Sequence, residues 1–362
     1  MIGKTRDQTS KVWKTRAAAL ALIMTMGIAH GATLCVWTNS PYPGAPYNAW
    51  TNAARDIQTA VDAAQPGDTV LVTNGLYVSG SYPSPTHTLG NRVVITTSVV
   101  VRSVNGPAAT VIQGRAAGET VERRCVYISG GGQLIGFTLT NGSARASASW
   151  LDGLGGGALI ERSGVVSDCV VCSNSATHGG GIAAYYGGEV RNCFVYGNSA
   201  GAGSWYYGGG FYGAQGAAVY DSMFSNNYCE VGGGVSLEGN CRVSRCAMVN
   251  NLAASGGGLS LKSGDVVDNC LIVSNVAIRS GGGVSFSSGA GVMRCCTVVG
   301  NVAQLYPDHS GTYHVSGGSV INSILVRNGD GSQNLDASLN YQADYLCTTP
   351  TPANGTGHVT LD

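Results

Sequence analysis

The chain has 362 residues, 55 of them glycine, and its 20 basic side chains balance 20 acidic ones, so the formal net charge at pH 7 is zero. With only 11% charged residues, it offers no basic surface for a polyanion, and this argues against a nucleic-acid partner. Abundant glycine together with 44% hydrophobic residues suits a long, thin core with many corners.

The first segment predicts export. Lys11, Lys14 and Arg16 precede an uncharged, apolar stretch over 17–28, and small residues follow it. So short a stretch cannot span a bilayer, and this order of segments is typical of a secretory signal peptide. We expect residues 1–31 to be removed, leaving a secreted or cell-surface protein without a transmembrane span. A retained membrane anchor is the alternative.

Residues 32–66 are expected to form a lead-in and an N-terminal cap. Between about residues 53 and 64, Ala53, Ile57, Val61 and Ala64 recur at helical spacing. A helix with one apolar face can cover the open end of a repeat array and keep its first strand from pairing with another molecule.

From residue 67 to 330 the chain repeats one unit. Each unit holds a glycine triplet, a short apolar stretch, a Cys or Ser and, five residues later, an asparagine. The asparagines recur every 24 to 29 residues, at Asn174, Asn198, Asn227, Asn251, Asn275, Asn301 and Asn328. A fixed period of this length marks a solenoid, whose units bury their apolar faces by stacking on one another.

Within each unit the apolar residues recur at period 2, and Val, Ile, Phe and Cys dominate, which indicates strands. We expect three short strands per coil, stacked in parallel about 4.8 Å apart, so that equivalent residues form ladders. The asparagines should occupy left-handed bends and hydrogen-bond along the stack, and the glycine triplets should form another corner. With less regular coils around Asn74, Asn105 and Asn141, about ten coils result.

These units, and the opening segment from Ala53 to Gly75, resemble the secreted bacterial right-handed parallel β-helix proteins of the pectin-lyase-like superfamily. The repeats are similar to those of polymorphic outer-membrane proteins and other adhesins. The resemblance implies an all-β, right-handed parallel β-helix solenoid of about ten coils with a short N-terminal capping helix. It also implies that residues 331–362, where the ladders fade, are an irregular segment of a truncated chain.

Five of the twelve cysteines fall in one ladder. Cys169, Cys193, Cys246, Cys270 and Cys296 are interpreted as buried thiols packed as small hydrophobes, with disulfides as the alternative. The chain has one Cys-x-x-Cys segment, and it lies on an expected strand where the two sulfurs would not converge. We therefore expect no metal site and no cofactor.

Three long insertions occupy the same slot of the repeat, after Asn141, Asn198 and Asn301. Insertions in a solenoid often build its binding face, and exposed aromatic rings stack on the apolar faces of sugars. The candidate glycan-binding residues in and beside the first two loops are Trp150, Asp152, His178, Trp205, Tyr206, Tyr207 and Glu230. The third loop adds Tyr306, Asp308, His309, Tyr313 and His314. The alternative is that these rings simply pack over the coils below.

Evidence for catalysis is thinner. Asp168 and Asp221 would lie two coils apart, near the limit for an inverting carboxylate pair, but a turn ladder with Asp221 paired to Arg245 is the favoured interpretation. His178, Glu230 and Arg279 precede glycine triplets and could act as acids or bases.

The chain lacks the Asn-Thr-Asp, Asp-Asp, Gly-His-Gly and Arg-Ile-Lys segments of the superfamily's polygalacturonases. The superfamily holds both enzymes and noncatalytic adhesins, so the fold does not decide the activity. We predict an adhesin-like or glycan-contacting surface module. A polysaccharide lyase or glycoside hydrolase acting on an acidic polysaccharide is the alternative, and a structural spacer is a third. The catalytic residues of such an enzyme are unknown.

Overall fold

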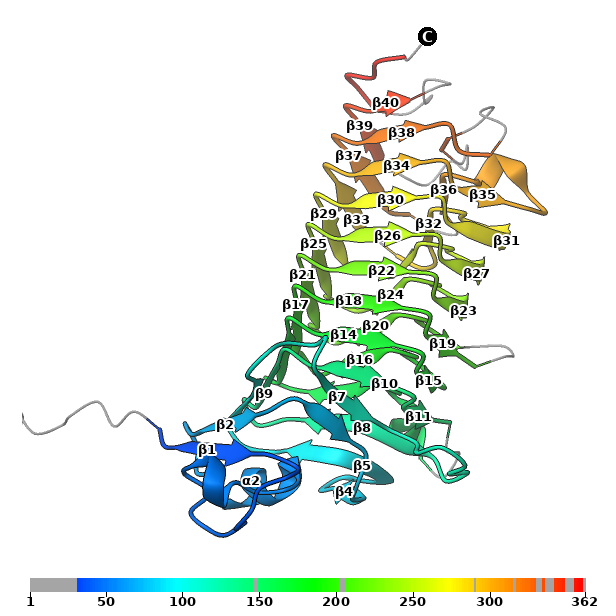
Figure 1. The fold of residues 1–362 in the computed structure, drawn as a ribbon. Coiled ribbons are helices and arrows are strands. Elements are labelled where there is room, and N and C mark those ends of the chain that lie inside the picture. Colours follow the sequence, from blue (N-terminus) through cyan, green and yellow to red (C-terminus); the bar gives the residue numbers. More distant parts are fainter. Residues whose placement is uncertain are drawn as a thin grey trace, which may run out of the picture.

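The structure, a computed structural model, describes residues 31–360 apart from 146–148, 202–205, 290, 315–316, 330–333, 336–341 and 349–354. The expected signal peptide therefore lies outside the described residues except for its last position. Coils stack upward from the N-terminal end, where helix α2 lies, to strands β39 and β40 at the other end (Figure 1). The expected right-handed parallel β-helix is confirmed.

Four sheets form the walls of the solenoid, and they are called sheets A to D here. Sheet A contains β1 (Thr33–Val36), β2 (Thr69–Val72), β6 (Val100–Ser103), β9 (Gln133–Ile135), β13 (Val165–Ser167), β17 (Glu189–Arg191), β21 (Ala218–Tyr220), β25 (Arg242–Ser244), β29 (Val266–Asp268), β33 (Val292–Arg294), β37 (Ser319–Ile321) and β39 (Gln342–Asp344). Sheet B contains β3 (Gly75–Tyr77), β7 (Thr110–Gln113), β10 (Thr138–Thr140), β14 (Val170–Cys172), β18 (Phe194–Tyr196), β22 (Met223–Ser225), β26 (Ala247–Val249), β30 (Leu271–Val273), β34 (Thr297–Val299), β38 (Ile324–Val326) and β40 (Cys347–Thr348).

Sheet C contains β4 (Tyr82–Ser84), β5 (His87–Ile95), β8 (Arg123–Ile128), β12 (Ala158–Glu161), β16 (Ile182–Tyr185), β20 (Phe211–Ala214), β24 (Val235–Glu238), β28 (Leu259–Leu261), β32 (Val284–Phe286) and β36 (Thr312–His314). Sheet D contains β11 (Ser143–Ala144), β15 (Ser175–Ala176), β19 (Ser199–Ala200), β23 (Tyr228–Val231), β27 (Leu252–Ser255), β31 (Val276–Ser280) and β35 (Val302–Ala303). Strand pairing is parallel throughout these sheets except between β4 and β5.

A regular coil thus has four strands, in the order A, B, D, C, and not the expected three. The extra strand is the short sheet D segment that follows each ladder asparagine. It was missed because two residues are too few to show alternation. The number of coils differs slightly from ten, because the sheets hold 12, 11, 10 and 7 strands. Pairing also continues into β39 and β40, within the segment that was expected to be irregular.

The expected capping helix is present as α2 (Ile57–Ala63). It begins later than expected because the Asp56 side chain accepts a hydrogen bond from Thr59 N at 2.8 Å and so caps it. Just before it, Ala54 pairs with Val36 as an isolated bridge. The helix packs on β1, β2 and β5 at the N-terminal end of the solenoid. Among the described residues, three short 3-10 helices lie outside the coils, η1 (Trp50–Asn52), η2 (Trp150–Gly153) and η3 (Pro307–His309).

The core consists of the apolar columns found in the sequence. The column on sheet A is fully buried and comprises Val166, Val190, Val219, Val243, Val267, Met293 and Val320. The column on sheet B is equally buried and comprises Val171, Val195, Phe224, Met248, Ile272, Val298 and Leu325. All twelve cysteines are free thiols, and the five ladder cysteines are buried.

The asparagines form a continuous buried ladder of hydrogen bonds. Asn174 Nδ2 donates to Asn198 Oδ1 at 3.0 Å and to Leu139 O at 3.0 Å, and the backbone N–H of Asn174 donates to the same Asn198 oxygen at 3.0 Å. The pattern repeats at each coil as far as Asn334, one step beyond the column found in the sequence.

The left-handed residue is the one before each ladder asparagine, for example Asn250 with φ 55°. The expectation that the ladder residue itself would be left-handed was therefore wrong. The reason is that its side chain must point into the coil to reach its neighbours.

The glycine triplets are explained by the same ladder. In the triplet that starts at Gly179, the first residue has a φ of 62°, which disfavours any other residue type. A Cβ on Gly180 would lie 2.4 Å from the backbone of Ser199 in the next coil. A Cβ on Gly181 would lie 3.0 Å from Asn198 Nδ2. The corner is therefore open only to glycine because the neighbouring coil and its amide lie against it.

The core register gives a first prediction. Val267 and Val266 are neighbours on β29, the first fully buried and the second facing outward. We expect Val267→Asp to abolish cooperative unfolding, because a buried carboxylate without a partner costs several kcal/mol. We expect Val266→Asp to stay close to wild type, because Arg242 lies opposite it. Thermal unfolding followed by circular dichroism measures both, and similar curves for the two variants would contradict this register.

The asparagine ladder gives a second prediction. Asn251→Ala removes the acceptor of Asn227 N and Nδ2 and the donor to Phe224 O, all buried. Since each stranded group costs about 1–3 kcal/mol, we expect at least about 3 kcal/mol of lost unfolding free energy in urea titrations. Asn250→Gly is the matched control, because glycine accepts the left-handed conformation without strain. Equal losses of unfolding free energy in the two variants would show that the hydrogen bonds of the ladder amide do not account for the loss.

Candidate functional site

Two of the three long loops meet at the corner between sheets D and C. The loop after Asn141 ends in η2, and the loop after Asn198 returns through residues 206 and 207. Both loops lie against the outward side of strands β16 and β20. Trp205, one of the candidate residues, lies outside the described residues. The other candidates can each be placed.

Four of the candidate side chains come together here with two tyrosines from sheet C. This aromatic cluster comprises Trp150, His178, Tyr185, Tyr206, Tyr207 and Tyr212. The Trp150 ring lies 5.1 Å from Tyr185 and 5.9 Å from His178, between ring centroids. Tyr206 and Tyr207 approach His178 from the second loop, at 6.1 and 5.5 Å. The insertions therefore build one joint cluster rather than separate loops.

Tyr185 and Tyr212 were not among the candidates. Both lie on strands whose alternate residues face the core, Ile182 on β16 and Phe211 on β20, so their own side chains point outward. That alternation was visible in the sequence. The loops that cover the outward side were not, because nothing in a loop sequence states which strand it lies on.

His178 is the centre of the cluster. Its ring stacks on Tyr207 with an interplanar angle of 16°, and its Nδ1 accepts a hydrogen bond from Tyr207 N at 3.3 Å. Burial lowers the pKa of His178 to about 4. The ring is therefore neutral at pH 7 and serves as an acceptor that fixes the second loop.

A polar series runs away from the cluster across sheet C. The Tyr212 hydroxyl donates to Glu238 Oε2 at 2.7 Å, and Lys262 Nζ donates to Glu238 Oε1 at 2.7 Å. Burial alone would raise the pKa of Glu238, but the hydrogen bonds from Lys262 and Tyr212 outweigh it and the pKa is lowered. Lys262 Nζ also lies 4.8 Å from the centre of the Tyr207 ring. The series ties the outward side of three adjacent coils to the cluster.

Asp152 and Glu230 do not join the aromatic contacts. Asp152 is fully buried and accepts hydrogen bonds from Thr88 N, Thr88 Oγ1 and Leu89 N at 3.0, 2.7 and 3.0 Å, so it fastens η2 to β5. Glu230, on β23, forms an ion pair with Arg279. It flanks the second loop, whose Tyr206 carbonyl accepts from the next residue of β23 at 3.1 Å.

The third loop forms a separate group. Tyr306, which is exposed and immediately precedes η3, lies 5.6 Å from His309, and His309 lies 4.4 Å from Tyr313, between ring centroids. Asp308 is exposed, and the side chain of His314 lies outside the described residues. Strand β36 is four strands from β20 in sheet C, about 19 Å at the spacing of a parallel sheet. The same slot of the repeat therefore carries two aromatic groups at a distance from each other.

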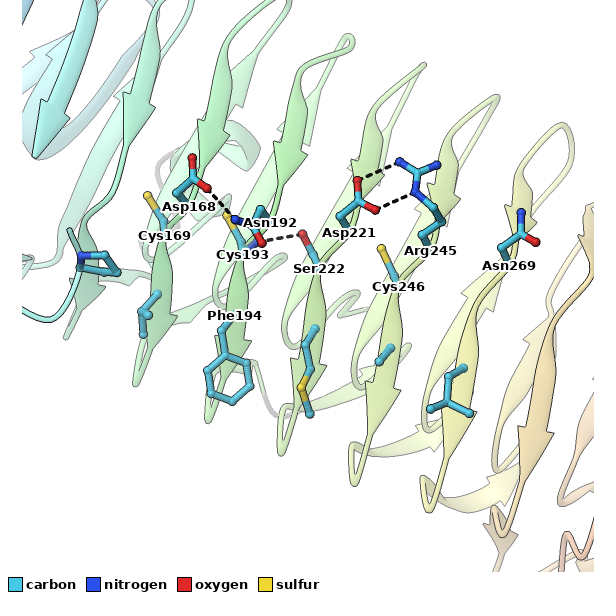
Figure 2. Close-up of a pocket in the computed structure, with 15 residues that line it drawn as sticks. Asp168, Cys169, Asn192, Cys193, Phe194, Asp221, Ser222, Arg245, Cys246 and Asn269 are labelled. Atoms are coloured by element: carbon cyan, nitrogen blue, oxygen red, sulfur yellow. Dashed lines mark hydrogen bonds and ion pairs between the residues drawn. The ribbon is translucent and has the colours of Figure 1, made fainter.

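A groove of about 830 Å³ lies at another corner, between sheets A and B (Figure 2). Arg245 donates to both carboxylate oxygens of Asp221, at 2.6 and 2.8 Å, and Asn192 Nδ2 donates to Asp168 Oδ1 at 2.6 Å. The hydrogen bond from Arg245 lowers the pKa of Asp221. This is the expected turn ladder, and an ionised, paired carboxylate is unsuited to act as the acid of a hydrolase.

Sheet C holds no carboxylate pair at hydrolase spacing among its described outward residues. Glu161 and Glu238 occupy equivalent positions three strands apart, about 14 Å, beyond the range of about 5–9.5 Å that both glycosidase mechanisms require. Glu161 is engaged elsewhere, because His87 Nε2 lies 3.3 Å from it and the Tyr127 hydroxyl donates to it. The described outward residues of sheet C thus contain no carboxylate pair at the spacing of a two-carboxylate glycosidase.

A search of the described residues finds no group of three or more His, Cys, Asp or Glu side chains that could hold a metal ion. Within the same residues, no helix is long and apolar enough to cross a membrane.

No family model matches the chain, and no curated protein matches it. Solved structures resemble it in fold. A pectate lyase shares 15% identity over 92% of this chain and 80% of its own, with a TM-score of 0.49. A lacto-N-biosidase from Eubacterium ramulus shares 11% over 98% and 70%, with a TM-score of 0.45, and an alginate lyase from Paenibacillus sp. str. FPU-7 shares 13% over 84% and 91%, with a TM-score of 0.41. At these identities the likeness concerns the fold alone.

The burial of His178 gives a third prediction. Its folded pKa of about 4 lies below the value of about 6.5 in an unfolded chain. The fold therefore favours the neutral ring, and its stabilising contribution is complete above pH 6.5 and is lost as the pH falls towards 4. We expect the unfolding free energy to fall across this window by up to about 3 kcal/mol more in wild type than in His178→Gln. Parallel pH profiles for the two proteins would contradict it.

Proposed function

We propose that the chain is a glycan-contacting surface module and that the aromatic cluster is its binding site. The observation that carries this proposal is a pair of exposed rings, Trp150 of the cluster and Tyr186 directly beside it. Trp150 is 47% exposed and Tyr186 is 52% exposed. Both rings nevertheless contact the Tyr185 ring, at 5.1 and 4.2 Å between ring centroids. Large aromatic side chains held rigid from below and open to solvent offer flat apolar faces to sugar rings.

Polar groups beside these rings suit the rim of a sugar. Gln215 is exposed, and its Nε2 donates to the Tyr185 hydroxyl at 3.4 Å. Glu238 lies on the neighbouring strand, with a side chain that is 42% exposed. Amide and carboxylate groups next to aromatic faces provide hydrogen bonds to sugar hydroxyls while the rings cover the apolar face. Because Lys262 forms an ion pair with Glu238, the charge of this carboxylate beside the proposed binding site is compensated.

The setting of this activity is part of the proposal. The basic and apolar order of the first segment favours export, and the repeats are similar to those of adhesins. We therefore infer a secreted or cell-surface protein that contacts polysaccharides or cell-surface glycans and acts without a cofactor or nucleic acid.

A polysaccharide lyase or hydrolase is the second candidate, and one observation favours it. Tyr212, Glu238 and Lys262 form a continuous series of hydroxyl, carboxylate and ammonium groups, which is the kind of series that transfers protons. The burial of Tyr212 keeps its hydroxyl from a substrate, and burial raises its pKa. The binding role therefore agrees better with the geometry.

The fourth prediction tests this function directly. We expect the purified protein to be retarded in native gels that contain its polysaccharide, from a panel of neutral and acidic polymers, and Trp150→Ala to reduce the apparent affinity at least about tenfold. Trp50→Ala is the matched control, since Trp50 is 39% exposed on η1, away from the cluster.

Equal loss of affinity in Trp150→Ala and Trp50→Ala, or a wild type that no polymer retards, would contradict the proposed site. The same polymers are assayed for new chain ends. Their release by wild type, and its loss in Glu238→Gln, would replace the binding module by the enzyme.

A further inference from the structure

The outer face of sheet B is apolar and open. Its outward column, one residue per coil, runs Val170, Phe194, Met223, Ala247, Leu271, Thr297 and Ile324. Phe194 and Met223 are each 38% exposed, Leu271 is 42% and Ile324 is 43% exposed. Large apolar side chains are thus exposed at four of the seven coils of this column, and an exposed apolar strip of this kind marks an interaction surface rather than a solvated wall.

Much of this strip lines the groove of Figure 2, and the polar residues of the groove form a second column beside it. From coil to coil this column runs Asp168, Asn192, Asp221, Arg245 and Asn269, and Cys295 continues it in the next coil. All six have positive φ at the corner between sheets A and B. Its acidic members lie on the N-terminal side and its one arginine on the C-terminal side. The strip and its polar border therefore have a direction.

Both columns are self-complementary about the point between β22 and β26. Reversal about that point places Asp221 opposite Arg245 and Asn192 opposite Asn269. In the apolar column the same reversal places the large Met223 opposite the small Ala247. Phe194 then meets Leu271, and Val170 meets Thr297.

We propose that this face binds a second copy of the chain in antiparallel orientation, with the two-fold axis between β22 and β26. The strands of the two copies then share a direction across the axis while the solenoids run in opposite directions. Each Arg245 meets the Asp221 of the partner while it keeps its own. A parallel copy, related by a two-fold axis along the solenoid, would instead carry the polar column of each copy to the opposite edge of sheet B and form no Asp221–Arg245 contact between copies.

The extent of the sheet fits such a contact. Six of the eleven strands of sheet B precede the axis and five follow it, so ten strands overlap, about 48 Å at the parallel-strand spacing. With strands three residues wide, about 10 Å, the flat overlap is about 500 Å² per copy, or about 1,000 Å² in total, which is the lower limit for a specific interface. We therefore expect a reversible dimer that forms with increasing protein concentration.

The proposal does not depend on the glycan site, which lies at the corner of sheets C and D. Sedimentation equilibrium of the purified protein tests it, with a dimer expected in wild type at tens of micromolar and a monomer in Met223→Glu. Met223 faces outward, so the variant keeps the core, and an unchanged circular dichroism melting curve verifies this. Leu252→Glu is the matched control, because Leu252 is also 38% exposed but lies on sheet D. It is expected to remain dimeric.

Charge exchange provides the second arm. Asp221→Arg and Arg245→Asp alone should each weaken dimerisation at least about tenfold, because each creates a like-charge contact across the axis. The double variant restores opposite charges within and between copies and should recover the dimer. A wild type that stays monomeric, a dimer that Met223→Glu leaves intact, or a double variant no better than the single ones would each overturn the proposal.

Orientation is measured through the native exposed thiol. Cys295 is the exposed cysteine, and Cys347, which is partly buried, is removed as Cys347→Ser. Spin labels on Cys295 of the two copies should lie about 25 Å apart in the antiparallel dimer. This distance combines five strand spacings along the solenoid with one spacing between the facing sheets. A distance near about 15 Å, about one sheet spacing across the interface and one strand width within it, would mean a parallel pair and overturn the proposed orientation.

Discussion

The asparagine ladder is the interaction on which the rest of the structure depends. Each amide receives two hydrogen bonds from the coil before it and gives two, one forward to the next amide and one back to a buried carbonyl. Its full hydrogen-bonding capacity is therefore used inside the core, where an unsatisfied amide would cost several kcal/mol. The ladder fixes the distance from coil to coil at one corner, and the glycine triplet packs against it from the next corner. These two corners leave the chain between them as the place where length can vary without disturbing the stack.

That freedom explains where the site lies. The first two insertions begin just after the ladder position of their coils, which Gly142 and Asn198 occupy, and end just before a triplet, so both ends of each loop are fixed. Between those ends the loops fold back over sheet C, and Asp152 and His178 hold them there by hydrogen bonds to β5 and to the second loop. The rigid part of the loops is thus buried and polar contacts secure it, while Trp150 and Tyr186 remain open. The residues that secure the site, Asp152 and His178, are different from Trp150 and Tyr186, which would face the proposed ligand, and Tyr186 was not among the candidates found in the sequence.

The sequence predicted the repeat, the core columns and the place of the insertions, because burial at a fixed period demands like residues at like positions. It could not show that Asp152 would be buried, since an acidic residue in a loop is usually solvated and its partners, Thr88 and Leu89, are distant in the chain. It also misplaced the left-handed residue by one position. Asparagine suits that conformation by itself, but the structure uses its amide for the ladder and gives the bend to its neighbour. Tyr185 and Tyr212 were missed because an outward position on a strand does not reveal what covers it.

The repeat has a consequence for how such a chain changes its length. Because every coil presents the same donors and acceptors to the next, a duplicated or deleted unit rejoins without loss only if it is a whole coil. A partial unit would leave an asparagine or a triplet without its counterpart. Duplication of a coil outside the overlapping strands lengthens the rod and leaves its faces in register. Duplication of a coil between Asp221 and Arg245 would instead separate the two halves of the self-complementary face. The tolerated sites of coil duplication should therefore not be evenly spread along the chain.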